Sequence, residues 1–147
     1  RDFAGVSWGP ADDPTVLYSL FVGIALAAGA AASLRTQRLR DGVVAAVWTL
    51  VIGTAIWSLE VLLLNYALWG SAHWYQFWLQ DGAVDDFHHS GSHNLSAFLL
   101  QDVQGALFFH QILSAVIGAV GGLLGSVVAS GGAALWSRVR RPASTPA

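Results

Sequence analysis

The sequence contains no cysteine, no methionine and no lysine, and only 11% of its 147 residues are charged. The absence of cysteine excludes disulfide bonds, thiolate metal sites and cysteine nucleophiles. With a net charge of −2, the chain lacks the basic surface by which proteins bind nucleic acid. The missing lysine and methionine indicate a GC-rich genome. The chain begins at Arg1 rather than at methionine, as expected after removal of a signal peptide or from a longer precursor.

Hydrophobic residues are abundant and make up 54% of the chain. A single globular core of this size cannot bury so much apolar surface, so lipid must cover the excess. About 20 apolar residues are needed for a helix to cross the hydrocarbon layer. Three apolar runs meet this length and predict an all-α integral membrane fold, a single domain over residues 1–147 with transmembrane helices at about 15–34, 43–69 and 103–136.

The arginines predict the orientation of these spans. Six of the seven lie in the first connection and in the C-terminal flank, which share one side of a three-span arrangement: Arg35, Arg38, Arg40, Arg138, Arg140 and Arg141. Cytoplasmic connections are rich in arginine and lysine. We therefore expect an extracytoplasmic N-terminus, an external loop over residues 70–102 and a cytoplasmic tail over residues 137–147. The plasma membrane of a GC-rich prokaryote fits better than an organelle.

The external connection is rich in aromatic residues directly after the second span. Residues 70–81 read GSAHWYQFWLQD and follow Trp69. Aromatic rings with a polar edge favour the lipid headgroup region. The segment is predicted to form an interfacial helix, or else an aromatic belt at the end of the second span. Residues 94–100 are predicted to form a separate short helix that leads into the third span.

Small residues recur at every fourth position of the third span. They form two adjacent rows, one with Gly118, Gly122, Ser126 and Ser130 and one with Gly121, Gly125, Ala129 and Ala133. Such rows let helix backbones approach closely in a membrane. Two rows on one helix indicate more than one neighbour and favour packing on partner subunits or on a copy of the chain. The alternative is that glycine and alanine are simply abundant.

A few polar residues fall inside the apolar runs. Glu60 and His110 lie at similar depth, supported by a set of polar neighbours: Asn65, Gln111 and Ser114. A carboxyl group in hydrocarbon must face protein or water or stay protonated. We expect an interaction between Glu60 and His110. It would serve as a proton relay, a quinone-side relay or a cofactor ligand, or else as a buried hydrogen bond that fixes the register of the helices. Haem or a pigment could bind through His110.

The external loop also carries a cluster of imidazoles and carboxylates: Asp85, Asp86, His88, His89 and His93. Zinc and copper(II) favour such ligands. The cluster is a candidate metal site, and the alternatives are a solvated polar loop or a pH-responsive contact.

No phosphate-binding loop, nucleophile elbow or zinc-protease motif occurs. The three spans and glycine-spaced third helix resemble the trimeric copper transporters. That family needs a methionine pair in its second span, which this chain lacks, so its function is not carried over. Two functions remain: a non-catalytic accessory subunit of a respiratory or photosynthetic type of complex, or a homo-oligomeric metal-handling or proton-coupled transporter whose histidine loop captures the ion.

Overall fold

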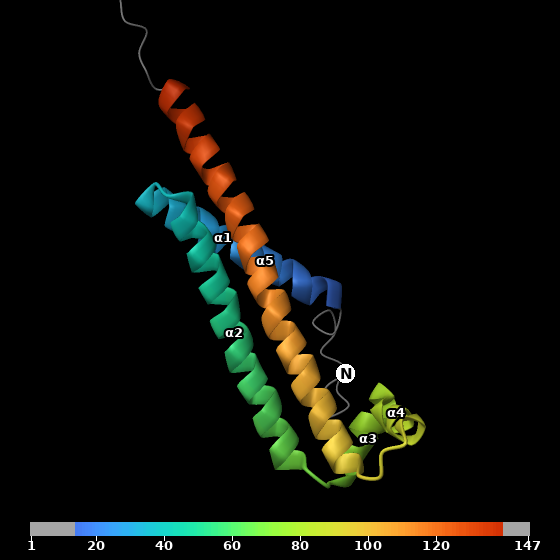
Figure 1. Cartoon of the computed structure of the whole chain (residues 1–147). Coiled ribbons are helices and arrows are strands. Elements are labelled where there is room, and N and C mark those ends of the chain that lie inside the picture. The colour runs from blue at the N-terminus through green and yellow to red at the C-terminus, as the bar shows by residue number, and fades with distance from the viewer. Residues whose placement is uncertain (1–13, 140–147) are drawn as a thin grey trace, which may run out of the picture. The chain divides into compact units, whose positions relative to one another are not determined.

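The computed structural model describes residues 14–139, which form five helices and no strand (Figure 1). The helices are α1 (Pro14–Thr36), α2 (Leu39–Leu68), α3 (Ala72–Asp81), α4 (Ala83–Ser90) and α5 (Leu95–Val139). Three stretches are long and apolar enough to cross a membrane: Thr15–Thr36, Leu39–Leu68 and Leu95–Ala133. The prediction of an all-helical chain with three membrane-spanning helices is confirmed at this level.

The third long helix differs from the prediction at both ends. It begins at Leu95 instead of residue 103, because the Asn94 side-chain oxygen accepts a hydrogen bond of 3.0 Å from the Ala97 backbone N–H. Residues 94–100 therefore do not form a separate helix. Residues 137–139 of the predicted tail are helical, while residues 140–147 lie outside the described part of the chain.

Residues with a positive φ mark the other helix boundaries. Gln37, with φ of 59°, separates α1 from α2, and its backbone N–H donates to Ser33 O at 2.8 Å. Gly70, Gly82 and Gly91 have φ of 72°, 93° and 73° and follow α2, α3 and α4. Glycine adopts this left-handed conformation without the steric cost of a side chain. The connection between α2 and α5 is thus divided into two short helices by its glycines.

The described chain divides into two compact units. The glycine unit consists of residues 18–52 and 113–139, and the tryptophan unit consists of residues 14–17 and 53–112. Helices α2 and α5 are each divided between the two units, with one part of the helix in each unit. Each unit has a buried cluster of its own.

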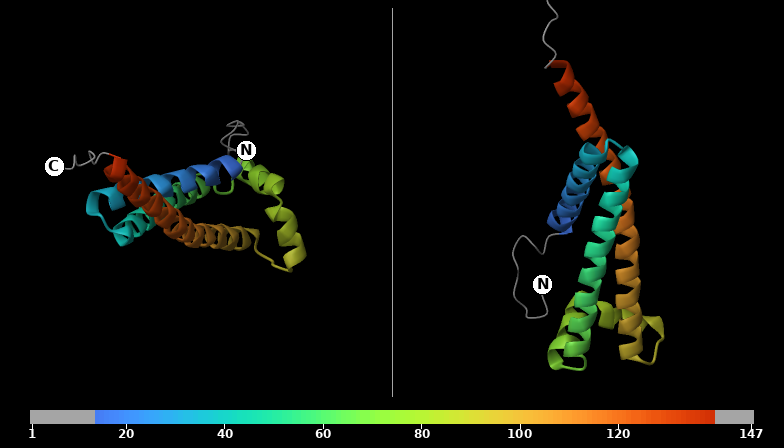
Figure 2. Two further views of the ribbon diagram at one scale, coloured as in Figure 1. Left: turned by 90° about the horizontal axis from the view of Figure 1, so that it is seen from above. Right: turned by 90° about the vertical axis from the view of Figure 1, so that its left-hand side faces the viewer.

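In the glycine unit, α1 crosses the first half of α2 and the second half of α5 (Figures 1 and 2). Its buried core consists of Ala25, Ala46 and Leu50, with Phe21, Ala28 and Ile117 packed against them. Along α5, Gly118 lies beside Val47 and Ser126 lies beside Gly42, so α5 and α2 are antiparallel. The C-terminal part of α5 therefore runs toward the α1–α2 connection that carries the arginines.

In the tryptophan unit, α3 and α4 join the end of α2 to the start of α5 (Figure 2). The core is larger than that of the glycine unit: Trp74, Trp78, Ala83, Val84, Leu99, Val103 and Leu107. Val61, Leu62 and Leu68 of α2 pack against it. The two short helices are thus anchored by apolar burial and do not form a free loop.

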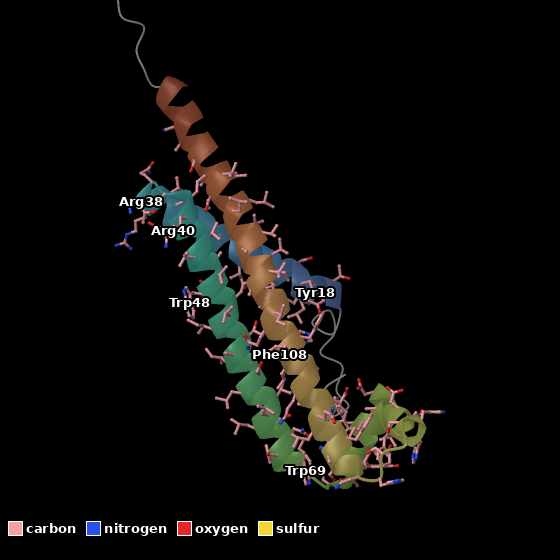
Figure 3. The ribbon with its side chains drawn as sticks, in the orientation of Figure 1. Tyr18, Arg38, Arg40, Trp48, Trp69 and Phe108 are labelled. Atoms are coloured by element: carbon pink, nitrogen blue, oxygen red, sulfur yellow. The ribbon has the colours of Figure 1, made fainter. Side chains whose placement is uncertain are left out.

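Many large apolar side chains remain exposed on the long helices. Figure 3 shows Trp48 pointing away from α2, and 60% of its surface is exposed. Others exposed by more than half include Leu20, Ile52, Ile56, Leu59, Leu63, Phe108, Phe109, Ile112, Val116 and Val128. Such surfaces require a lipid or protein neighbour.

Candidate functional site

The first row of small residues in α5 packs on α2 of the same chain. A Cβ added to Gly118 would lie 2.8 Å from Val47 Cα, and one added to Gly122 would lie 2.7 Å from Ala46 Cβ. The buried Ser126 hydroxyl lies 2.7 Å from Gly122 O and 3.1 Å from Gly29 O, the second of which belongs to α1. These residues hold the three helices of the glycine unit in close contact.

The second row packs on α1. A Cβ on Gly121 would lie 2.7 Å from Ala25 Cβ, and one on Gly125 would collide with the backbone oxygen of Leu26. Gly118, Gly121, Gly122, Gly125 and Ser126 therefore have their neighbours inside the chain, whereas Ser130 and Ala133 are exposed. Packing of these rows on partner subunits or on a second copy stays a prediction.

The tryptophan unit contains a buried polar pair. Asn65, only 1% exposed, accepts a hydrogen bond of 2.6 Å at its Oδ1 from Trp74 Nε1. The Trp74 ring also lies 5.1 Å from the Trp69 ring, which stacks on Tyr66 at 6.1 Å. The polar residue predicted in the span thus serves to tie α3 to α2. The partner of Asn65 could have been predicted from the indole of Trp74, because a buried indole N–H needs a hydrogen-bond acceptor.

Glu60 lies on the outward face of α2. It is exposed, and no hydrogen bond or ion pair joins it to another residue of the described chain. It precedes the end of α2 by eight residues, about 12 Å along the axis. Val61 and Leu62 point to the core while Leu63 and Leu64 are exposed beside the carboxyl. Glu60 is therefore a polar group in an apolar and otherwise uncovered surface.

His110 has other neighbours than the predicted Glu60. Its Nδ1 lies 2.7 Å from Ala106 O, so this nitrogen carries the proton and donates it. Its ring lies 5.4 Å from the Trp57 ring and 5.8 Å from the Phe109 ring. No direct hydrogen bond joins Glu60 to His110 in the described part of the chain, and the α2 side chain in contact with the imidazole is Trp57. An interaction of Glu60 with His110 through water stays a prediction.

Of the remaining polar residues predicted within the spans, Gln111 of α5 contacts α2. Gln111 Nε2 donates to Ser58 Oγ at 3.5 Å, and Ser114 is buried. Gln104, Ser58 and Gln111 line a shallow groove of about 360 Å³ whose other walls are apolar. The sequence reasoning identified Gln111 and Ser114 and missed Ser58, which resembles any other isolated serine in a span.

A second shallow groove of about 520 Å³ lies along α5 beside His110. It is lined by Phe98, Gln101, Asp102, Gly105, Ala106, Phe109 and His110, all on one helix. The Nδ1 bond of His110 leaves Nε2 as the nitrogen that could ligate haem or a pigment. One wall alone does not enclose such a cofactor, so ligation through His110 stays a prediction.

His88 and His89 lie in a helix, whereas His93 lies in the connection between α4 and α5. Asp85, Asp86, His88 and His89 belong to α4, because Ala83 and Val84 at its start are buried in the core. His89 Nδ1 donates to Asp85 O at 2.7 Å. Among residues 14–139, no three His, Cys, Asp or Glu side chains lie close enough to hold a metal ion. Zinc or copper binding by these residues and His93 remains a prediction without an assembled site.

The comparisons with known proteins do not assign this chain to a family. No family model, no curated protein and no solved structure matches it. The function must therefore be argued from the placement of its side chains.

Proposed function

We propose that this protein is a non-catalytic accessory subunit of a larger, multi-subunit membrane complex of the respiratory or photosynthetic type. The observation that carries the proposal is Glu60, a carboxyl group exposed in the middle of an apolar helix face and without a partner in the described chain.

Lipid is a poor neighbour for this face. A charged carboxyl costs about 3 kcal/mol at the centre of a span, and carboxyl groups within spans usually face protein or a water-filled cavity. Within the described chain, Glu60 is exposed and is not part of the core of the tryptophan unit. A neighbouring protein that covers Glu60 removes the cost.

The other features of the chain fit an accessory role. The polar residues that the structure does pair act between helices of the chain: Asn65 with Trp74, and Ser58 with Gln111. The exposed Tyr66 and Trp69 at the end of α2 fit a headgroup contact. We further propose that this end is extracytoplasmic and that the arginine-bearing end is cytoplasmic.

A homo-oligomeric metal-handling or proton-coupled transporter is the competing function. Exposed Glu60 residues from several copies could line a shared pore, which is the observation in its favour. Its external capture site would need His88, His89 and His93 to converge.

Gentle purification of the native complex followed by native mass spectrometry tests the proposal. We expect unlike subunits in fixed stoichiometry, recovered again when the tag is moved to one of them. Absorbance of the same sample reports any haem or pigment. Recovery of copies of this chain alone would contradict the subunit role and favour the transporter.

A further inference from the structure

We infer that the face of α2 around Glu60 binds a transmembrane helix of an unlike subunit through a cationic side chain, arginine or lysine. This inference rests on the proposed role as a subunit and names the chemistry of the contact. It concerns the outward face of one helix within the tryptophan unit.

The surroundings of Glu60 form a surface that a helix can cover. Ile56 and Leu63 are 65% and 61% exposed, and Trp57 and Leu64 are 40% and 42% exposed. These side chains surround the carboxyl with apolar contact area. Gly53, two turns before Glu60, has no atom within 4 Å of the position of a Cβ. A partner backbone can approach there, as small residues allow in membranes.

Two groups on this face favour a cation. The carboxylate of Glu60 supplies the charge, and a paired charge in a low-dielectric region is far less costly than an isolated one. Trp57, one turn earlier, packs one side against His110 and leaves 40% of its surface exposed. An indole attracts cations, and the planar arginine group stacks on it especially well.

A second copy of the chain does not supply this cation. The sequence has no lysine, and its seven arginines are Arg1, Arg35, Arg38, Arg40, Arg138, Arg140 and Arg141. None falls between residues 43 and 133, where the second and third spans lie. His110 is half-buried and already donates through Nδ1. An unlike subunit is therefore the source that the charge pattern favours.

A defined peptide tests the chemistry. The full chain is reconstituted in phosphatidylcholine vesicles with a leucine-rich transmembrane peptide of about 20 residues that carries one arginine at the depth of Glu60. Association is measured by fluorescence transfer. We expect the arginine peptide to bind the wild-type chain about tenfold more tightly than it binds the Glu60→Gln variant. A peptide with leucine at that position should not distinguish the two.

Two further variants serve as controls. Asp102→Asn removes another exposed carboxyl of the tryptophan unit and should leave binding of the arginine peptide unchanged. Trp57→Leu should weaken binding less than Glu60→Gln. Circular dichroism and thermal unfolding verify that each variant keeps the wild-type fold. Equal binding of the arginine and leucine peptides to the wild-type chain would overturn the inference, as would equal binding of the arginine peptide to wild type and Glu60→Gln.

The native complex separates this inference from the proposed function. If Glu60→Gln lowers recovery of the unlike subunit about tenfold and that subunit carries an arginine or lysine within a span, both stand. If the subunit is recovered undiminished or has no such cation, the inference fails and the accessory role holds. If no unlike subunit is found, both fail.

Discussion

The residues that matter most to the glycine unit are those without side chains. Helices attract one another in lipid mainly through close packing, because lipid tails are as apolar as leucine. Gly125 meets the backbone of Leu26, and Gly118 meets the backbone of Val47. A backbone cannot swing aside as a flexible side chain can, so these contacts tolerate no added methyl group without helix separation.

Gly125→Ala should destabilise the protein by about 1–3 kcal/mol, because the new Cβ collides with Leu26 O and forces α1 away from α5. The measurement is thermal or denaturant unfolding in detergent micelles, followed by circular dichroism. Gly131→Ala is the matched control, since Gly131 lies in the same helix and has nothing within 4 Å. It should be neutral or gain up to about 1 kcal/mol from the better helix propensity of alanine. Equal effects of the two changes would contradict the packing assigned to Gly125.

The Asn65–Trp74 pair predicts a coupled loss of stability. Asn65→Leu leaves the buried Trp74 N–H without its acceptor, and Trp74→Phe leaves the buried amide without its donor. Each change should cost about 1–3 kcal/mol, and the double variant should cost less than the sum of both. The free energies of unfolding of the wild-type protein, the two single variants and the double variant, measured in detergent micelles, give this coupling energy.

Trp48→Phe is the control for the aromatic change, because Trp48 is 60% exposed on α2. It should alter the free energy of unfolding by about 0.5 kcal/mol or less. Strict additivity of Asn65→Leu and Trp74→Phe would show that the hydrogen bond contributes nothing.

At the scale of elements, the ends of α3 and α4 determine the path of the connection between α2 and α5. The Ser71 Oγ accepts from the Trp74 N–H at 3.0 Å and starts α3, and Gly82 ends α3 and begins the turn into α4. This turn places Ala83 and Val84 in the core beside Trp78. The position of α4 therefore depends on one residue in the left-handed conformation.

Gly82→Ala should destabilise the tryptophan unit by about 1–2 kcal/mol, because alanine at φ of 93° is strained. Gly105→Ala, at an open helical position, should not destabilise it. Limited proteolysis between α3 and α4, together with thermal unfolding, measures the difference. A Gly82→Ala variant as resistant as wild type would show that the turn does not hold α4.

At the scale of the whole molecule, three helices long and apolar enough to cross a membrane predict that the two ends of the chain lie on opposite sides of it. We expect a tag at Arg1 to be accessible from outside intact cells and a tag at Ala147 to be accessible only after permeabilisation. The reason is the concentration of arginine at the α1–α2 connection and at the C-terminal flank. Labelling both tags from the same compartment would contradict the three-span orientation.

Sequence reasoning found the helical class and the three spans because length and hydrophobicity are local properties of the chain. Of the two alternatives for residues 70–81, the helix is the one found, at residues 72–81. Sequence reasoning did not predict α4, because five of the eight residues of this helix are polar and its anchor is only the short apolar pair Ala83 and Val84.

Composition and periodicity by themselves determined that this protein is built from helices, three of them long and apolar enough to cross a membrane. Only the tertiary structure decided which helix faces look inward. In the structure, α1 and α2 pack against the glycines of α5, and the Trp57 ring contacts the His110 ring. Asn65 accepts a hydrogen bond from Trp74. The physical reason is that periodicity fixes which residues share a face, while the contacts of that face depend on packing between segments far apart in the chain.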